Sequence, residues 1–394
     1  MRGCAAYSPP RIRAPGAQRS GRVACTGTGK RWPATTSRVR EPASPIYLVA
    51  RYEESYVTFE PELRPGPPWV MEEMIWAELD LPEQIASSSD AARLASHLRN
   101  AIQAGEPVLF TGCGTSEHAA RAAQAMVAGA HPGAMLASRD AFEARLAVPA
   151  GGLVVAISHE AGTAATLDAA RGASEAGARV VLITAQPERV PAGIEPIGTP
   201  LHDRSWCHTV AYLSPLLLHA SFAGLGSGRA HELIAAQLAA RSQRREDAGR
   251  LASCGRLLVV GSGVDEITAA ELALKVEEAA HVPATPLGAE KILHGHLPAA
   301  DRDTGLVLLG FDPDHRDERD RRSADVAAAA SVLEMPTVRL GGRDAVTRAE
   351  ALLAGAVALQ LLTLEFCLAV GTNPDLIRRE QPLYRQAAEA ARAG

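Results

Sequence analysis

The sequence predicts an α/β fold in which two related halves each carry a parallel sheet flanked by helices. Apolar, strand-like runs alternate with helical patterns along most of the 394-residue chain. Such alternation implies parallel strands joined by right-handed crossovers. In addition, the plan of residues 107–126, PVLFTGCGTSEHAARAAQAM, recurs in residues 256–275, RLLVVGSGVDEITAAELALK. Each copy reads as a buried strand that runs through a Gly-x-Gly turn into a helix.

The composition excludes several classes of protein. A net charge of −5 and the lack of a basic–aromatic surface motif argue against a nucleic-acid partner. No uninterrupted apolar run is long enough to span a membrane, so no membrane partner is expected. The six cysteines are scattered, without a close pair or metal-ligand spacing. We therefore expect no metal and a reducing compartment, the cytoplasm.

The N-terminal segment differs from the rest of the chain. Residues 1–40 are rich in Arg, Pro and Ser and contain no Asp or Glu, which predicts disorder. They resemble an organelle leader, but a dispensable extension upstream of a true start at Met71 is the favoured interpretation. The polar stretch ARSQRREDAGR is the expected boundary between the halves. The predicted division is an N-terminal extension over 1–70, a first domain over 71–245 and a second over 246–394.

The apolar runs place the strands and helices. In the first half, strands are expected at 107–112, 133–137, 153–158 and 179–184, separated by helices at 116–129, 140–147 and 163–176. A helical region over about 208–250 leads into strands at 256–261, 305–311 and 338–340, with helices at 265–280, 320–332 and 345–370. The charged run over 312–322 is predicted to be a solvated loop and helix start.

The two copies of the turn differ in charge. A strand–turn–helix unit aims backbone N–H groups and the positive end of the helix dipole at whatever lies above it, which favours an anion. The first copy adds the hydroxyls of Thr115 and Ser116, whereas the second has the carboxylate of Asp265, which repels phosphate. The first turn is therefore predicted to hold phosphate and the second is not.

A second strand end strengthens this prediction. Ser158 and Thr163 flank another turn before a helix, and adjacent strand ends form the ligand crevice of an open parallel sheet. The alternative is ordinary helix capping by Thr115 and Thr163. A dinucleotide site is disfavoured because Glu117 occupies the third glycine position of that fingerprint. The sequence thus indicates a phosphate site and implies no organic cofactor.

Four motifs make the chain resemble a known family. They are GCGTS at 112–116, ISHEAGTAATL at 157–167, ALKVEEAAHVPATPLGAEKILHGHL at 273–297 and NPD at 373–375. Over residues 75–394 the chain resembles the double-SIS (sugar isomerase) family, which includes the isomerase half of glucosamine-6-phosphate synthase and related sugar-phosphate isomerases and deaminases. The resemblance implies two flavodoxin-like SIS domains, a sugar phosphate or amino-sugar phosphate as ligand, and a homodimer.

The resemblance also implies roles for individual residues. Glu278 falls on the position of the acid–base carboxylate, Lys275 lies three residues earlier as an electrostatic helper, and His294 falls on the histidine linked to ring opening in the neighbouring subunit's site. The substrate- and phosphate-binding positions fall on Cys113, Gly114, Thr115, Ser116, Ser158, His159, Glu160 and Thr163. A carboxylate can move a carbon-bound proton, a cation can stabilise the enolate, and histidine can shuttle protons at neutral pH.

Each catalytic assignment has a plainer alternative. Lys275 has the spacing of a helix-surface ion pair with Glu271 or Glu278. Glu278 has an exposed neighbour in Glu277, and its own role could be limited to pairing with Lys275. His294 could be a helix or loop cap, and His296 stands where the family usually has Pro.

Two departures from the family pattern affect the predicted chemistry. Glu160 replaces a hydroxyl in the second phosphate turn, and a carboxylate beside phosphate is costly. We expect Glu160 to turn away and meet a substrate amine, sugar hydroxyls or a protein cation. Residues 373–394 contain no Lys for a Schiff base, and no Cys follows the initiator Met as an N-terminal nucleophile. Glutamine-dependent amidotransfer is therefore not expected.

The predicted function is isomerisation or deamination of hexose or amino-hexose phosphates. A phosphosugar sensor without turnover stays open as an alternative, because it needs only the phosphate turns. A deglycase acting on sugar–amine phosphate conjugates also stays open, because it uses the same proton chemistry.

Overall fold

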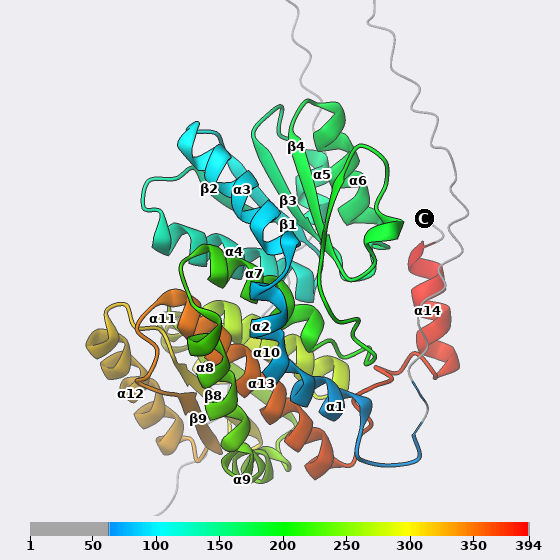
Figure 1. The fold of residues 1–394 in the computed structure, drawn as a ribbon. Coiled ribbons are helices and arrows are strands. Elements are labelled where there is room, and N and C mark those ends of the chain that lie inside the picture. Colours follow the sequence, from blue (N-terminus) through cyan, green and yellow to red (C-terminus); the bar gives the residue numbers. More distant parts are fainter. Residues whose placement is uncertain (1–61, 63, 393–394) are drawn as a thin grey trace, which may run out of the picture. The chain divides into compact units, whose positions relative to one another are not determined.

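The computed structural model describes residue 62 and residues 64–392; the predictions for residues 1–61 lie outside this range. The first half is a parallel sheet in the order β2-β1-β3-β4-β5 (Figure 1). This is the flavodoxin-like strand order, in which the switch point lies between β1 and β3. The strands are β1 (Val108–Gly112), β2 (Leu136–Asp140), β3 (Leu153–Ile157), β4 (Arg179–Thr184) and β5 (Glu195–Gly198).

Alternate residues of these strands face two different layers of helices. Phe110 and Val155 belong to the main core, whereas Leu109 and Val154 pack with residues of α5 and α6. This division follows from the two-residue period of a strand. The helices of this half are α3 (Ser89–Gln103), α4 (Thr115–Ala130), α5 (Ala141–Leu146), α6 (Ala164–Glu175) and α7 (Val210–Phe222).

The second half repeats the same topology with one strand fewer. Its parallel sheet has the order β7-β6-β8-β9, so the switch point lies between β6 and β8. Its strands are β6 (Arg256–Gly261), β7 (Ala284–Gly288), β8 (Thr304–Gly310) and β9 (Thr337–Gly341). Its helices are α10 (Asp265–Ala279), α11 (Ala289–Lys291), α12 (Arg316–Val332) and α13 (Arg348–Val370). The predicted fold class, two parallel sheets flanked by helices, is confirmed.

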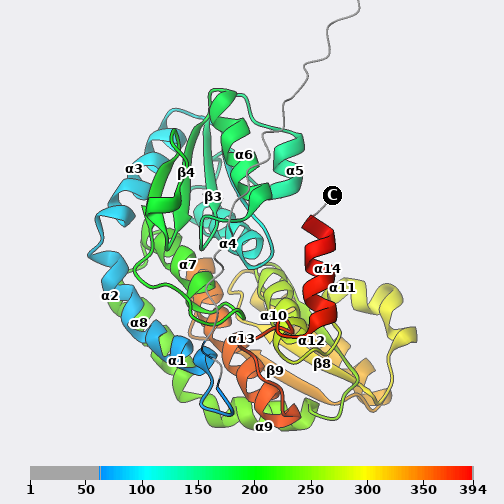
Figure 2. The same ribbon diagram turned by 90° about the vertical axis from the view of Figure 1, so that its right-hand side faces the viewer.

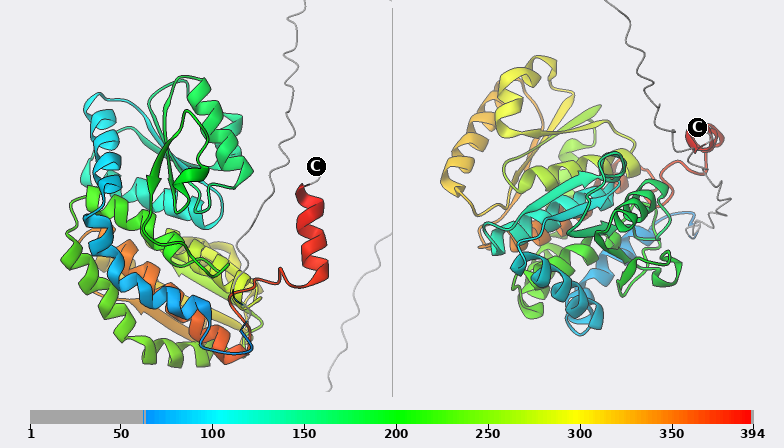
Figure 3. Two further views of the ribbon diagram at one scale, coloured as in Figure 1. Left: turned by 45° about the vertical axis from the view of Figure 1, so that its right-hand side comes forward. Right: turned by 90° about the horizontal axis from the view of Figure 1, so that it is seen from above.

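One hydrophobic core joins the halves. Residues of α4, α7, α10 and α13 belong to a single buried cluster, and these helices contact one another between the two sheets (Figure 3). Within the described residues, α13 is the one helix long and apolar enough to cross a membrane, but most of it is buried inside the protein. Its apolar length is thus explained by its position in the core.

The remaining helices frame this core. They are α1 (Val70–Ala77), the 3-10 turn Glu78–Asp80, α2 (Leu81–Ala86), α8 (Ser227–Ala239), α9 (Arg241–Leu251) and α14 (Pro382–Arg392). The polar stretch expected to separate the halves is α9 itself, which packs along α13. The residues of α14 whose burial is described are all exposed, and Figure 2 shows this helix standing beside the sheets.

Two strands and one burial state differ from the sequence-based expectations. The strands β5 and β7 were not predicted; both are edge strands, and both contain a proline, Pro196 and Pro286. Proline weakens a strand pattern but is tolerated at an edge. The charged run 312–322 was predicted to be solvated, which is wrong for Asp312, because its carboxylate is buried against the turn after β6.

Candidate active site between the two halves

The two predicted phosphate turns lie at the switch point of the first sheet. Cys113 and Gly114 connect β1 to α4, and residues 158–163 connect β3 to α6. Gly114 has φ +57°, and a Cβ there would meet nothing closer than Leu274 at 3.9 Å. Gly112 allows close strand–helix approach, since its Cβ would lie 2.6 Å from the backbone of Ser116. The turn therefore packs tightly against the start of α4 at Gly112, whereas the space beside Gly114 is open.

The hydroxyl groups at these turns are not used as helix caps. Thr163 occupies the N-cap of α6 without a side-chain cap bond, and Gly114 is the N-cap of α4. The capping alternative for Thr115 and Thr163 is therefore wrong. The Ser158 hydroxyl lies 3.5 Å from the Thr163 hydroxyl. Two N-terminal helix ends and these hydroxyls converge at one sheet edge, which suits an anion.

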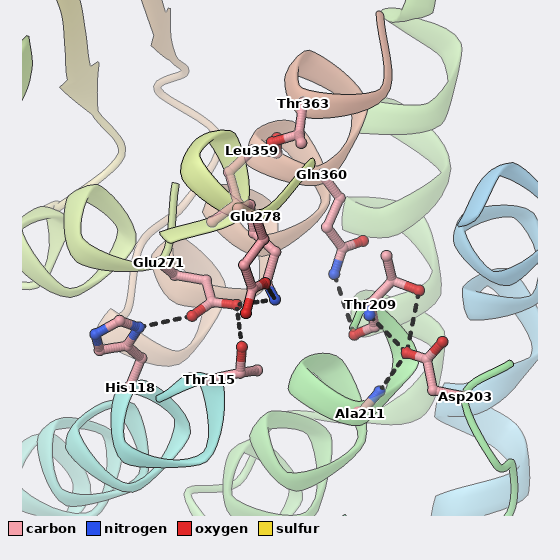
Figure 4. Close-up of polar contacts among 11 residues, drawn as sticks. Thr115, His118, Asp203, Thr209, Ala211, Glu271, Glu278, Leu359, Gln360 and Thr363 are labelled. Atoms are coloured by element: carbon pink, nitrogen blue, oxygen red, sulfur yellow. Dashed lines mark hydrogen bonds and ion pairs between the residues drawn. The ribbon is translucent and has the colours of Figure 1, made fainter. Parts of the chain in front are cut away.

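Thr115 links this edge to the second half. Its hydroxyl donates to Glu271 Oε1 at 3.1 Å, and His118 Nδ1 lies 2.6 Å from Glu271 Oε2 (Figure 4). Thr115 and His118 belong to α4, whereas Glu271 belongs to α10. The first turn of α4 is thus fixed to α10 by a buried carboxylate.

Lys275 sits in the same cluster with two carboxylates. Its Nζ lies 2.7 Å from Glu278 Oε2 and 3.6 Å from Glu271 Oε1. The Lys275 side chain is 1% exposed, so the surface ion pair considered from the sequence is wrong, although both partners are as expected from the spacing. Glu278 is 27% exposed, whereas Glu271 is fully buried. Glu278 is therefore the carboxylate of this cluster that a ligand can reach.

The electrostatics keep Lys275 and Glu271 charged. Burial lowers the pKa of Lys275, but the attraction of Glu278 and Glu271 outweighs it and holds the pKa well above its usual value. Burial raises the pKa of Glu271, but Lys275 and the bonds from His118 and Thr115 hold it below its usual value. The described geometry is thus an ammonium clamped between two carboxylates.

Three histidines lie beside the turn between β3 and α6. His159 packs against His202 and His208, with ring centroids 5.0 and 5.4 Å apart, and its Nε2 accepts a hydrogen bond from the Asp203 backbone N–H at 2.8 Å. Burial and the neighbouring His202 lower the pKa of His159 to about 3, so its ring is neutral. Its side chain supports the loop at 202–209.

Glu160 meets a histidine of this loop. Its Oε1 lies 3.6 Å from His202 Nε2, and hydrogen bonding to this imidazole lowers the pKa of Glu160. The expected contact of Glu160 with a substrate amine, sugar hydroxyls or a protein cation stays a prediction. Cys113, in the first turn, accepts a bond from Thr166 at 3.7 Å, and burial raises the pKa of its thiol.

His294 is not brought into this cluster within one chain. It lies in the irregular helical turn Ile292–His296, is 70% exposed, and its Nε2 is 2.8 Å from Glu290 Oε1. Glu290 also pairs with Arg322 of α12. Among the described residues, His294 makes no hydrogen bond or ion pair with Lys275 or Glu278.

The NPD motif anchors neighbouring segments. Both oxygens of Asp375 accept backbone N–H groups at the start of α1, from Val70 at 2.8 Å and Met71 at 2.7 Å. The backbone carbonyl of Asp375 accepts a hydrogen bond from the N–H of Trp206. The guanidinium of Arg379 lies over the Trp206 ring, 4.8 Å from its centroid. The motif thus ties the C-terminal segment to the histidine-rich loop.

The turn after β6 (residues 262–264), the second of the two Gly-x-Gly turns, is closed by the chain's own side chains. Asp312 Oδ2 accepts the backbone N–H of Val264 at 2.7 Å and pairs with Arg319. Asp265 turns away from it and accepts the N–H groups of Phe311 and Asp312 at 3.0 and 3.1 Å. A Cβ on Gly263 would collide with Asp312 and Arg319. The carboxylate of Asp312, which follows β8, therefore occupies the place where an anion would bind at this turn.

Sequence patterns missed His118, Glu271 and Asp203 as members of the site. Asp203 is buried and accepts the backbone N–H groups of Ser205, Thr209 and Ala211, which shapes the loop before α7. Of these three residues, only Glu271 could have been found from the sequence, because it lies four residues before Lys275 and so on the same helix face. Among the described residues, no three His, Cys, Asp or Glu side chains form a group suited to a metal ion.

Comparisons with solved structures identify the fold. The C-terminal domain of glucosamine-fructose-6-phosphate aminotransferase from Francisella tularensis matches with TM-score 0.66 and 18% identity, covering 80% of this chain and 99% of that one. Tagatose-6-phosphate ketose/aldose isomerase from Escherichia coli matches with TM-score 0.65 and 17% identity, covering 81% and 97%. Glucosamine-6-phosphate deaminase from Thermotoga maritima matches with TM-score 0.60 and 17% identity, covering 78% and 97%.

No protein-family model and no curated protein matches the chain. At these identities the solved structures establish the fold alone. The predicted resemblance is confirmed at this level: the chain has the double-SIS fold of phosphosugar isomerases and deaminases.

Proposed function

We propose that this protein binds a hexose phosphate or amino-hexose phosphate and catalyses its aldose–ketose isomerisation, with or without deamination. The observation that carries the proposal is the clamped Lys275, placed next to the first phosphate turn through Glu271 and Thr115. The neighbours named as isomerases and as a deaminase support the same class of substrate.

In this proposal the first half binds the phosphate and the second half supplies the catalytic residues. Ser116, Ser158 and Thr163 hold the phosphate together with the N-terminal ends of α4 and α6. Glu278 removes and returns the carbon-bound proton, because it is the exposed carboxylate of the cluster. Lys275 stabilises the enolate charge, which arises beside a preorganised cation.

Ring opening is assigned to His294 of a second subunit. His294 is largely exposed and its described partner is Glu290, so its imidazole is free to enter a neighbouring site. A homodimer is therefore part of the proposal, as is a cytoplasmic location. The four cysteines in the described residues, Cys113, Cys207, Cys254 and Cys367, are all free thiols, which suits a reducing compartment.

Glu160 distinguishes the substrates within this class. Its carboxylate lies 3.6 Å from His202 Nε2 and is 23% exposed, so a substrate amine or hydroxyl can compete for it. An amino-sugar phosphate would gain a charged partner there, whereas a neutral sugar would gain a hydrogen bond.

A sensor without turnover is the second candidate. It is favoured by the buried Lys275, which is already neutralised by Glu271 and Glu278. A deglycase for sugar–amine phosphate conjugates remains within the first proposal, because it needs the same proton transfer.

Proton exchange tests these candidates. The purified full chain is incubated in deuterium oxide with hexose 6-phosphates, amino-hexose 6-phosphates and sugar–amine conjugates, and NMR follows deuterium at the carbon next to the carbonyl and ammonia release. Glu278→Gln should abolish exchange and retain binding. Glu277→Gln, one residue earlier and exposed, is the matched control. Tight binding without exchange in the wild type establishes the sensor and overturns the enzyme.

A further inference from the structure

The second sheet has its own cavities at the edge where parallel sheets bind ligands. An inner cavity of about 20 Å³ lies at the switch point between β6 and β8, lined by Asp265, Asp312, Arg319 and Ser323. An outer pocket of about 300 Å³ is lined by Arg316, Asp320, Arg339, Arg343 and three glycines at the ends of β8 and β9. The two share Gly310, Arg316 and Asp320.

The inner cavity contains buried polar atoms that lack a partner. Asp265 is 3% exposed and its Oδ1 has no hydrogen-bond partner, while its Oδ2 is used by two backbone N–H groups. Ser323 is 9% exposed and its hydroxyl is also unpartnered. Leaving such groups unpaired costs free energy, so a hydrogen-bonding atom belongs in this space. The volume admits a single water or hydroxyl group.

The outer pocket is positively charged. Together the two cavities are lined by four arginines and three aspartates, so the net charge is 4 − 3 = +1 with all groups ionised. Arg316 donates to the carbonyls of Gly342 and Ala345 and has no carboxylate partner in the described residues. Arg339 is exposed and has no described ion pair or hydrogen bond, and Arg343, also exposed, pairs with half-buried Asp320. Guanidinium groups in such a pocket fit a phosphate or carboxylate.

We propose that these two cavities form a second ligand site for a small hydroxylated anion, a sugar phosphate or a sugar acid. The anionic group lies against Arg339 and Arg343, and one hydroxyl reaches Asp265 Oδ1 and Ser323 in the inner cavity. The site is independent of the proposed reaction, because none of its residues belongs to the first phosphate turns or to the Lys275 cluster.

Titration calorimetry on the full chain tests the site. A Ser116→Ala, Ser158→Ala double variant removes the hydroxyls of the first site, and glucose 6-phosphate, gluconate and inorganic phosphate are the probes. We expect one hydroxylated anion to bind once per chain, about 10-fold more tightly than inorganic phosphate. Preference for glucose 6-phosphate identifies a phosphorylated ligand, and preference for gluconate identifies a sugar acid.

Variants then separate the two parts of the site. Arg339→Ala with Arg343→Ala should weaken binding of all anions at least about 10-fold, whereas Arg99→Ala, at an exposed arginine of α3, should leave it unchanged. Asp265→Asn, or Ser323→Ala if the first variant does not fold, should remove only the preference over inorganic phosphate. Absence of binding in the serine double variant, or equal affinity for all three probes, would overturn the proposal.

Discussion

The turn after β1 and the turn after β6 have the same backbone plan, but different atoms lie above them. Both begin with a glycine whose Cβ would strike the following helix, and both contain a glycine at positive φ, Gly114 and Gly263. A Cβ on Gly114 would meet nothing closer than Leu274 at 3.9 Å, whereas a Cβ on Gly263 would collide with Asp312 and Arg319. A helix N-terminus favours an anion, and at the turn after β6 the chain itself supplies one in Asp312.

The largest predicted effect concerns Lys275 and Glu271, the charged residues of α10 that lie next to the first turn. Lys275→Met leaves Glu271 buried without its cation, so the free energy of unfolding should fall by about 3–5 kcal/mol. Urea denaturation measures this, and Lys291→Met, at an exposed lysine, is the control. Adding Glu271→Gln to Lys275→Met should recover part of the loss. An unchanged urea midpoint in Lys275→Met would contradict the clamped geometry.

A matched pair of glycine variants tests whether only the second turn is filled. Gly114→Ala and Gly263→Ala both place a side chain at positive φ, which costs about 1–3 kcal/mol. Only Gly263→Ala also collides with Asp312 and Arg319, which adds about 1–3 kcal/mol. Thermal or chemical unfolding of the two variants gives the difference directly. Equal destabilisation would mean that the two turns are equally open.

The hydroxyls of the first turn should affect affinity rather than stability. Ser116→Ala removes a donor to a charged phosphate, so the Kd for a hexose 6-phosphate should rise about 10-fold or more, at little cost in melting temperature. Ser174→Ala, at the far end of α6, is the control for losing a serine hydroxyl. An unchanged Kd for Ser116→Ala would move the phosphate away from this turn.

The smallest predicted effect is a pH dependence that only the second turn can show. Burial raises the pKa of Asp265 to about 6, above its unfolded value, so between about pH 4 and pH 6 the folded state binds the proton more tightly. Stability from this group therefore falls as the pH rises through that window. Relative to Asp265→Asn, the wild type should lose roughly 1–3 kcal/mol between pH 4 and pH 7. A pH-independent difference would contradict the assigned burial.

The sequence predicted what is encoded locally. The Gly-x-Gly turns, the apolar central strands and the spacing of Lys275 and Glu278 are short-range patterns, and the structure contains all of them. The edge strands β5 and β7 were missed because proline hides an edge strand in a local pattern. The bond from Thr115 to Glu271 and the closure of the second turn by Asp312 join residues far apart in sequence. Such pairings depend on how the halves pack, which a local pattern does not contain.

The position of α13 has a consequence for the synthesis of the chain. This helix, residues Arg348–Val370, follows α4, α7, α8, α9 and α10 in the sequence, and it contacts all of them at the centre of the shared core. A ribosome must therefore translate the chain through Val370 before the apolar faces of the earlier helices acquire their cover. During that interval the nascent protein exposes surface that aggregates or recruits chaperones. Contacts of such long range also slow the final folding step.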